Sequence, residues 1–172
     1  MAKKLRDSHP PRGLLRLGFR SPLLLYRAHL GWLLGDRFLM LSHTGRKSGR
    51  QRQVVLEVVR HEKENGIYIV ASGWGEKSDW FRNVTKNPFV LIQSGTHQTK
   101  ARAVRLSEKE AELELRDYGR RHPAAFRNLA KLMLGNGSSG TDEDIHRLVQ
   151  DVPLVAFIPD SKEPAQAGYT SS

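Results

Sequence analysis

The chain alternates between short apolar runs and turn-forming residues from about residue 37 to residue 106. Short runs rich in Val, Ile, Leu and Phe that end at Gly, Asn or Ser are typical of β-strands. Sequential strands joined by tight turns pair antiparallel, so this region predicts a curled antiparallel sheet or a small barrel. The expected strands lie at about 37–43, 51–60, 67–72, 89–94, 98–106 and 152–158.

Helical patterns flank and interrupt these strands. Ser21 followed by Pro22 is typical of a helix start, and the leucines around it recur at helical spacing, which predicts a helix within residues 11–35. Ser107 stands three residues before Glu110, which predicts a capping box at the start of a helix that runs to about residue 121. The other expected helices are a short one at 78–84 capped by Ser78, one at 123–134, and a short one capped by Thr141.

This order of elements predicts an α+β protein with one main domain. We expect residues 1–10 to form a disordered basic lead, residues 11–160 to form the domain with its N-terminal helix, and residues 161–172 to form a flexible tail. A Rossmann fold is not expected, because the strands do not alternate with long helices and the GxGxxG motif is absent.

Composition narrows the function classes. The formal net charge of +10 over 172 residues indicates an anionic partner, and the absence of cysteine excludes disulfides, thiolate metal sites and cysteine nucleophiles. The histidines form no HExxH or HxxxH pattern, so we expect no metal site. No apolar run reaches the roughly 18 residues that a membrane span needs, and no secretory signal pattern is visible. A cytoplasmic location is therefore expected.

The segment between the first two expected strands concentrates cations. Residues 44–52, which we call the basic loop, read TGRKSGRQR, with Arg46, Lys47, Arg50 and Arg52 beside two glycines. Guanidinium and ammonium groups bind phosphate and carboxylate, and glycine lets the backbone approach a ligand closely. The loop is not a Walker A motif, because the GxxxxGK[ST] order is absent. It therefore predicts an anion site, and the alternative is a solvated basic hairpin turn.

Three motifs together resemble a known family. They are TGRKSG at 44–49 with Arg52, VASG at 70–73 followed by DWFRN at 79–83 and Asn-Pro at 87–88, and VPLVAFIP at 152–159. In this order and spacing, over about residues 37–160, the chain resembles the deazaflavin-dependent nitroreductase family, whose members are split β-barrel oxidoreductases that use coenzyme F420. The resemblance implies a split β-barrel of the FMN-binding-protein type, mostly antiparallel, with flanking helices.

The resemblance also implies a cofactor site. F420 is the expected cofactor, and FMN is the alternative that the motifs favour less. The coenzyme's phosphate and acidic glutamyl tail would be held by Arg46, Lys47, Ser48 and Arg52, and Asn83 would help to close the phosphate pocket. The deazaflavin ring would be bordered by Gln53, Val54, Val55, Leu56, Ala71, Ser72, Gly73 and Trp74.

The implied reaction is hydride transfer from reduced F420 to a small-molecule acceptor of the quinone, nitro or enone type. The cofactor supplies the difficult chemistry, and the protein chiefly positions both partners. Ser72, Tyr118 or water are the candidates for protonating the reduced acceptor. The oligomeric state, monomer or homodimer, stays open.

The chain departs from well-known members of this family at three places. Gly73 stands where a lysine is usual, Val54-Val55 replaces an Asn-Pro pair, and Glu57 replaces a tyrosine on the acceptor side. These departures leave the acceptor open. They also allow a second hypothesis, a non-catalytic protein that binds or carries F420, a flavin or a tetrapyrrole.

A third hypothesis is a basic protein that binds nucleic acid or a membrane surface. Aromatic residues make up only 8% of the chain and form no stacking pattern, so nucleic acid is not the expected partner. Arginines interleaved with leucines within residues 11–35 would suit a helix in peripheral contact with a membrane. We favour the alternative, a helix packed on the barrel with its cations in water.

Most of the other notable residues near the motifs are interpreted as structural. His43, beside the basic loop, is interpreted as a structural residue rather than a ligand contact. Trp80 and Phe81 are expected in the core, and Asp79 in the first turn of its helix is expected to support that helix end. Trp74, in a loop flanked by glycines, is the better candidate for touching a ligand.

Overall fold

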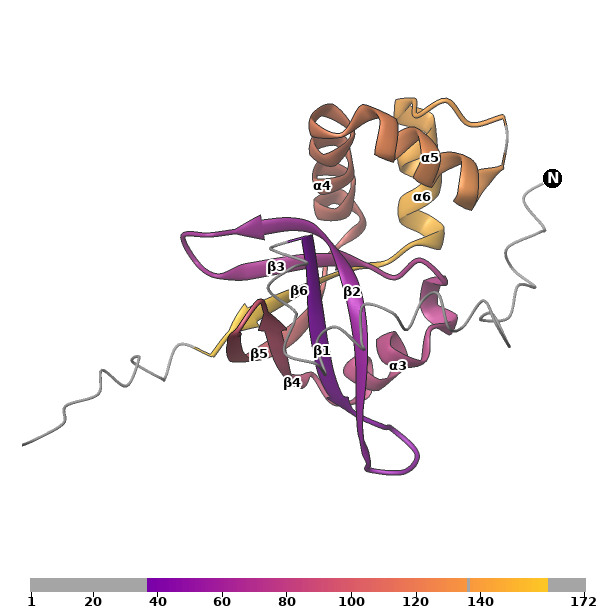
Figure 1. The fold of residues 1–172 in the computed structure, drawn as a ribbon. Coiled ribbons are helices and arrows are strands. Elements are labelled where there is room, and N and C mark those ends of the chain that lie inside the picture. Colours follow the sequence, from indigo (N-terminus) through magenta and orange to yellow (C-terminus); the bar gives the residue numbers. More distant parts are fainter. Residues whose placement is uncertain (1–36, 136, 161–172) are drawn as a thin grey trace, which may run out of the picture.

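The computed structural model describes residues 37–135 and 137–160. Six antiparallel strands close into a barrel in the order β1-β2-β3-β6-β5-β4 (Figure 1). The strands are β1 (Phe38–Thr44), β2 (Gln51–Glu62), β3 (Ile67–Ala71), β4 (Phe89–Ser94), β5 (His97–Arg105) and β6 (Leu154–Pro159). The predicted antiparallel barrel is confirmed, and each predicted strand appears within two residues at either end.

The helices form two groups around this barrel. A 3-10 turn, η2 (Gly75–Lys77), leads into the short helix α3 (Asp79–Lys86), which lies against β1. The longer helices α4, α5 and α6 pack against one another on another side of the barrel (Figure 1). Their bounds are α4 (Glu108–Arg121), α5 (Pro123–Leu134) and α6 (Asp142–Asp151).

Two hydrophobic cores result from the alternation of side chains along the strands. One core fills the barrel and includes Leu39, Leu41 and Phe157 from the strands, together with Trp80 and Phe81 from α3. The other core lies between the outer face of β2, β3 and β6 and the helices α4–α6. Burying one large apolar side chain contributes about 1.5–3 kcal/mol, so the placement of α3 and of α4–α6 follows from their apolar faces.

Strand β6 takes part in both cores. Val155 and Phe157 point into the barrel, whereas Leu154 and Ala156 pack against the helices. All four are buried. A strand buried on both faces carries a continuous apolar run instead of an alternating one, which explains the run seen at 152–158.

Among the described residues the predicted helix starts are confirmed, but one predicted capping side chain is not. Ser107 forms a capping box with Glu110, and Thr141 forms one with Asp144. Ser78 occupies the position before α3, but its side chain does not cap that helix. Its hydroxyl instead lies 2.7 Å from the hydroxyl of Ser72, so the predicted role as a capping side chain is wrong.

Other expectations fall partly outside the described residues. Trp80 and Phe81 are buried, as predicted. The helix expected within residues 11–35, the basic lead and the tail lie outside the described residues. In the described part of the chain, no helix is both long enough and apolar enough to cross a membrane.

Candidate functional site

The basic loop is folded tightly on itself. The Gly45 amide donates to the Arg50 carbonyl at 2.8 Å, and the Gly49 amide donates to the Gly45 carbonyl at 2.8 Å. A Cβ atom at Gly45 would stand 2.9 Å from Ser48 Oγ and 3.0 Å from Arg52 Nε. Those two side chains therefore close over Gly45, where only a glycine leaves room for them. The loop thus brings two of the predicted anion-binding groups together.

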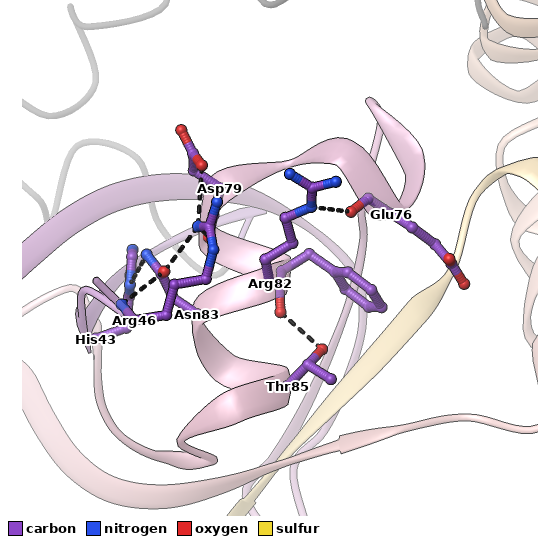
Figure 2. A network of polar contacts seen from close by, with 8 residues as sticks. His43, Arg46, Glu76, Asp79, Arg82, Asn83 and Thr85 are labelled. Atoms are coloured by element: carbon purple, nitrogen blue, oxygen red, sulfur yellow. Dashed lines mark hydrogen bonds and ion pairs between the residues drawn. The ribbon is translucent and has the colours of Figure 1, made fainter.

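Arg46 fastens this loop to helix α3 (Figure 2). Its Nη1 lies 3.0 Å from Asp79 Oδ1 and 3.0 Å from Asn83 Oδ1, and its backbone N–H donates to the same Asn83 oxygen at 3.0 Å. The ammonium of Lys86 donates to the Arg46 carbonyl at 3.2 Å. Arg46 is thus held by a carboxylate and a carboxamide of the chain itself, and only a fifth of its side chain is exposed.

Asn83 also contacts His43 on β1. Both residues are buried, and Asn83 Nδ2 lies 3.2 Å from His43 Nδ1. Burial lowers the pKa of His43 below 6.5, and the nearby charge of Arg52 lowers it further, against a smaller opposite effect of Asp79 and of a hydrogen bond to the Thr44 backbone. His43 is therefore uncharged at neutral pH.

Three further cations of the loop are not held in this way. Lys47, Arg50 and Arg52 are exposed, and among the described residues their side chains form no ion pair. Close like charges without counter-ions attract an anion more strongly than the same charges already paired. The loop therefore offers an anion-binding surface, with Arg46 and its partners as the support beneath it.

An open strand edge begins next to the loop. Strand β2 pairs with β1 along residues 51–57, but it pairs with β3 only from Val58 onward, where a bulge shifts the register. On the β3 side, residues 51–57 have no strand partner in the described part of the chain, and we call this stretch the open edge. It contains the predicted residues Gln53, Val54, Val55 and Leu56, and the backbone polar groups that point away from β1 have no strand partner there among the described residues.

The segment after β3 is fixed by hydrogen bonds. Ser72 is fully buried, its hydroxyl donates to the Gly75 carbonyl at 2.8 Å, and its backbone N–H donates to the Pro153 carbonyl at 2.9 Å. This bonding gives the Ser72 hydroxyl a structural role. A role as proton donor would require its single proton to leave the Gly75 carbonyl. Trp74, between Gly73 and Gly75, is 38% exposed.

Tyr118 lies at a different place from the loop. It is on α4, half-buried against the helical core, and its pKa is raised by burial first and by the charge of Glu57 second. Glu57 is six residues from Gln51 along β2, about 20 Å in an extended strand. Tyr118 is therefore near the far end of the open edge and keeps its proton at neutral pH.

Apart from Tyr118, the predicted residues thus lie in three places. The cations, Ser48 and Asn83 belong to the basic loop and its contact with α3, the β2 residues form the open edge, and residues 71–74 begin at the last residue of the short strand β3. The bond from Asn83 to His43 was not predicted. The alternation Leu39, Leu41, His43 along β1 was the available signal, because it places His43 on the inward face.

No metal site accompanies this arrangement in the described residues, where no three His, Asp or Glu side chains cluster suitably. The chemistry on offer is anion binding at a loop together with a strand edge that a flat, polar-rimmed molecule could contact. Comparisons with known proteins bear on which class of protein this is.

A model of the F420H(2)-dependent quinone reductase family matches residues 26–132. A Mycobacterium tuberculosis protein named as a candidate F420H(2)-dependent quinone reductase is 36% identical over 74 residues, which cover 42% of this chain and 60% of that relative. Among solved structures, a protein of unknown function from Agrobacterium tumefaciens has the same fold, with a TM-score of 0.52, 17% identity, and coverage of 89% of this chain and 60% of that one.

An F420-H2 dependent reductase of known structure is also similar, with 23% identity and a TM-score of 0.48 over 72% of this chain and 96% of that one. The family match extends over more than half of the chain and includes the basic loop, the open edge and α3. The chain belongs to the F420H(2)-dependent quinone reductase family.

Proposed function

We propose that this protein binds coenzyme F420 and uses its reduced form to reduce a quinone. The observation that carries the proposal is the position of Lys47, Arg50 and Arg52, three cations that form no ion pair with another described residue, at the start of an open strand edge. A ligand with an acidic tail and a planar ring matches that combination, because each part meets a surface of suitable chemistry.

The residues present fit the two parts of the coenzyme. Phosphate and glutamyl carboxylates suit Lys47, Ser48 and Arg52, with Arg46 held beneath them by Asn83. The ring would lie along the open edge, between the backbone groups of residues 53–56 and the segment Ala71, Ser72, Gly73 and Trp74 at the end of β3. Gly73, in place of a lysine, leaves the phosphate charge to the basic loop.

When bound, the reduced coenzyme supplies a hydride equivalent, and the quinone needs one further proton to become a hydroquinone. The chain's residues hold and orient the two reactants, which accounts for a large part of the acceleration in such reactions. Of the two predicted proton donors, Tyr118 keeps its proton at neutral pH and lies toward the Glu57 end of the open edge, whereas the Ser72 hydroxyl is bound within its turn. We assign the proton to Tyr118 or to water.

A binding experiment with charge-matched variants tests this function. Oxidised F420 is titrated into the wild type, into a Lys47→Ala/Arg52→Ala variant, and into an Arg120→Ala/Arg147→Ala variant with the same net charge. Arg120 and Arg147 are exposed on the helices α4 and α6. Losing two contacts with charged groups should weaken binding about 100-fold or more in the loop variant, while the helix variant binds like the wild type.

Turnover separates an enzyme from a carrier. Reoxidation of bound reduced F420 is followed after adding a quinone such as menadione, and then a nitroaromatic and an enone. Fast reoxidation by the quinone supports the proposed reaction. The rates with the nitroaromatic and the enone then rank these acceptors against the quinone. Tight F420 binding without reoxidation by any acceptor would make the protein a carrier. Equal loss of binding in both double variants would mean that net charge, and not the loop, attracts the coenzyme.

A further inference from the structure

We propose that His43 is a positioning residue for the anion site: by accepting a hydrogen bond from Asn83, it fixes the carboxamide that holds Arg46. The inference rests on the proposed function for the identity of the ligand, but not for the arrangement of His43, Asn83 and Arg46. It predicts that the coenzyme binds less tightly once His43 takes up a proton.

The orientation of the Asn83 carboxamide follows from its neighbours. Two donors from Arg46, the backbone N–H and Nη1, both point at one end of that group at 3.0 Å. Only the oxygen of a carboxamide accepts hydrogen bonds, so Oδ1 faces Arg46. The NH2 group of Asn83 is then directed at His43, whose Nδ1 is 3.2 Å away (Figure 2).

The state of the His43 ring follows in turn. A nitrogen that receives an N–H from Asn83 must carry no proton, so His43 is neutral and its proton is on Nε2. The charged groups that act on the ring are Arg52 from β2 and Asp79 from α3. Arg52 belongs to the anion site itself, so a protonated His43 would add a third positive charge close to Arg46 and Arg52.

Protonation of His43 cannot be accommodated by turning the carboxamide over. With Nδ1 protonated, two N–H donors would face each other across 3.2 Å. Turning Asn83 would relieve that contact but would direct its NH2 group at both donors of Arg46. Either way a buried hydrogen bond is lost, and the Arg46 end of the basic loop loses its support on α3.

The direction of the pH effect can be worked out. The pKa of His43 in the folded protein is below 6.5, so the unfolded chain takes up a proton at this residue before the folded protein does. Stability from the neutral ring is complete above pH 6.5 and is lost as the pH falls through the lowered pKa of the folded protein. Coenzyme affinity should fall over the same interval if the neutral ring supports Arg46.

The first test reads the ring directly and needs no ligand. In protein carrying 15N-labelled histidine, the two ring-nitrogen shifts of His43 are followed by NMR as the pH is lowered, with His43→Asn used to assign the signals. At neutral pH we expect His43 to carry a proton on Nε2 and none on Nδ1. The midpoint of its titration should lie below pH 6.5. A proton on Nδ1 at neutral pH would overturn the inference whether or not F420 binds.

The second test measures the dissociation constant of oxidised F420 between about pH 8 and pH 5 for the wild type, His43→Asn and His43→Leu. Asparagine places a carboxamide oxygen where Nδ1 stood, and it does not titrate. The pH dependence of F420 affinity in His43→Asn therefore shows the contribution of the coenzyme's own acidic groups. His43→Leu should bind about fivefold more weakly throughout, as expected for one lost hydrogen bond.

At the upper end of this pH range the wild type should bind F420 as tightly as His43→Asn does. At the lower end its affinity should have fallen about fivefold more than that of His43→Asn. Full affinity in His43→Leu, or parallel pH profiles of wild type and His43→Asn across the measured titration of His43, would refute the positioning role. Absence of F420 binding in every variant would refute the proposed function instead, and the NMR result would then decide the inference alone.

Discussion

Asn83 connects three parts of the molecule through one carboxamide. It sits on α3, accepts from Arg46 of the basic loop and donates toward His43 of β1. Because the group is buried, each of these bonds contributes more by avoiding an unpaired polar atom than by its direct strength. A few buried polar atoms therefore determine where the exposed cations of the loop stand.

Gly75 is a residue whose identity is dictated by its surroundings. Its backbone has a φ of +60°, and a Cβ atom there would stand 2.7 Å from the Asp151 carbonyl oxygen at the end of α6. Gly75→Ala should therefore lower the free energy of unfolding by about 2 kcal/mol or more, from the left-handed backbone and the clash together. Urea unfolding followed by far-UV circular dichroism measures this change.

Gly73→Ala is the matched control in the same turn. A Cβ at Gly73 would have no atom within 4 Å, so that variant should stay within about 0.5 kcal/mol of the wild type. Equal stability of the two variants would mean that the turn around Trp74 can shift away from α6 at little cost.

Local signals predicted most of the elements, and tertiary contacts decided the rest. Strand ends and the box at Ser107 depend on neighbouring residues, so they can be read from the chain. Ser78 also stands directly before a helix, but Phe81 replaces the glutamate of a capping box, and the Ser78 hydroxyl bonds to Ser72 six residues earlier. A serine before a helix was therefore not a sufficient signal for a cap.

The same distinction applies to the candidate site. The cations of the basic loop are adjacent in sequence and could be grouped before the fold was known. The open edge was not predicted, although the expected strands 51–60 and 67–72 already differ in length, because its extent depends on the register and the bulge between β2 and β3. The bond between His43 and Asn83 joins residues forty positions apart, and no local pattern specifies such a pair.

Helix α4 offers a test of a locally determined element. Glu110 accepts from the Ser107 backbone N–H at 2.8 Å and from its hydroxyl at 2.7 Å. Loss of the cap in Ser107→Ala should lower the free energy of unfolding by about 1 kcal/mol, and Ser107→Thr, which keeps a hydroxyl, should recover most of it. Urea unfolding of the three proteins measures both effects.

The pH dependence of the stability lost in Ser107→Ala is a second measurement on the start of α4. The Ser107 hydroxyl and then its backbone N–H lower the pKa of Glu110 below 4.5. A lowered carboxyl pKa stabilises the fold above pH 4.5, and that stabilisation is lost as the pH falls through the pKa of the folded protein. The difference between wild type and Ser107→Ala should therefore narrow in acid. A difference in the free energy of unfolding that is constant with pH would argue against the Ser107–Glu110 capping box.

At the scale of the whole molecule, the barrel and the three helices depend on one shared strand. Alternate residues of β6 face the barrel core and the helical core, so neither core can be complete while β6 is displaced. The turn that carries Trp74 is attached on both sides of this junction. Ser72 bonds to Pro153 just before β6, and Gly75 packs against the end of α6.

This shared strand predicts that the described domain unfolds as one unit. Leu39 in the barrel core and Leu148 in the helical core are both fully buried, so Leu39→Ala and Leu148→Ala should each cost about 2–5 kcal/mol. In both variants the emission of Trp80, measured with Trp32 and Trp74 replaced by phenylalanine, should change at the same urea concentration as the helical circular dichroism signal.

If Leu148→Ala instead loses its helical signal before the Trp80 signal, then α4–α6 unfold separately, and the barrel with its basic loop would be stable without them. Coincident transitions would mean that damage to the distant helical core also removes the coenzyme site.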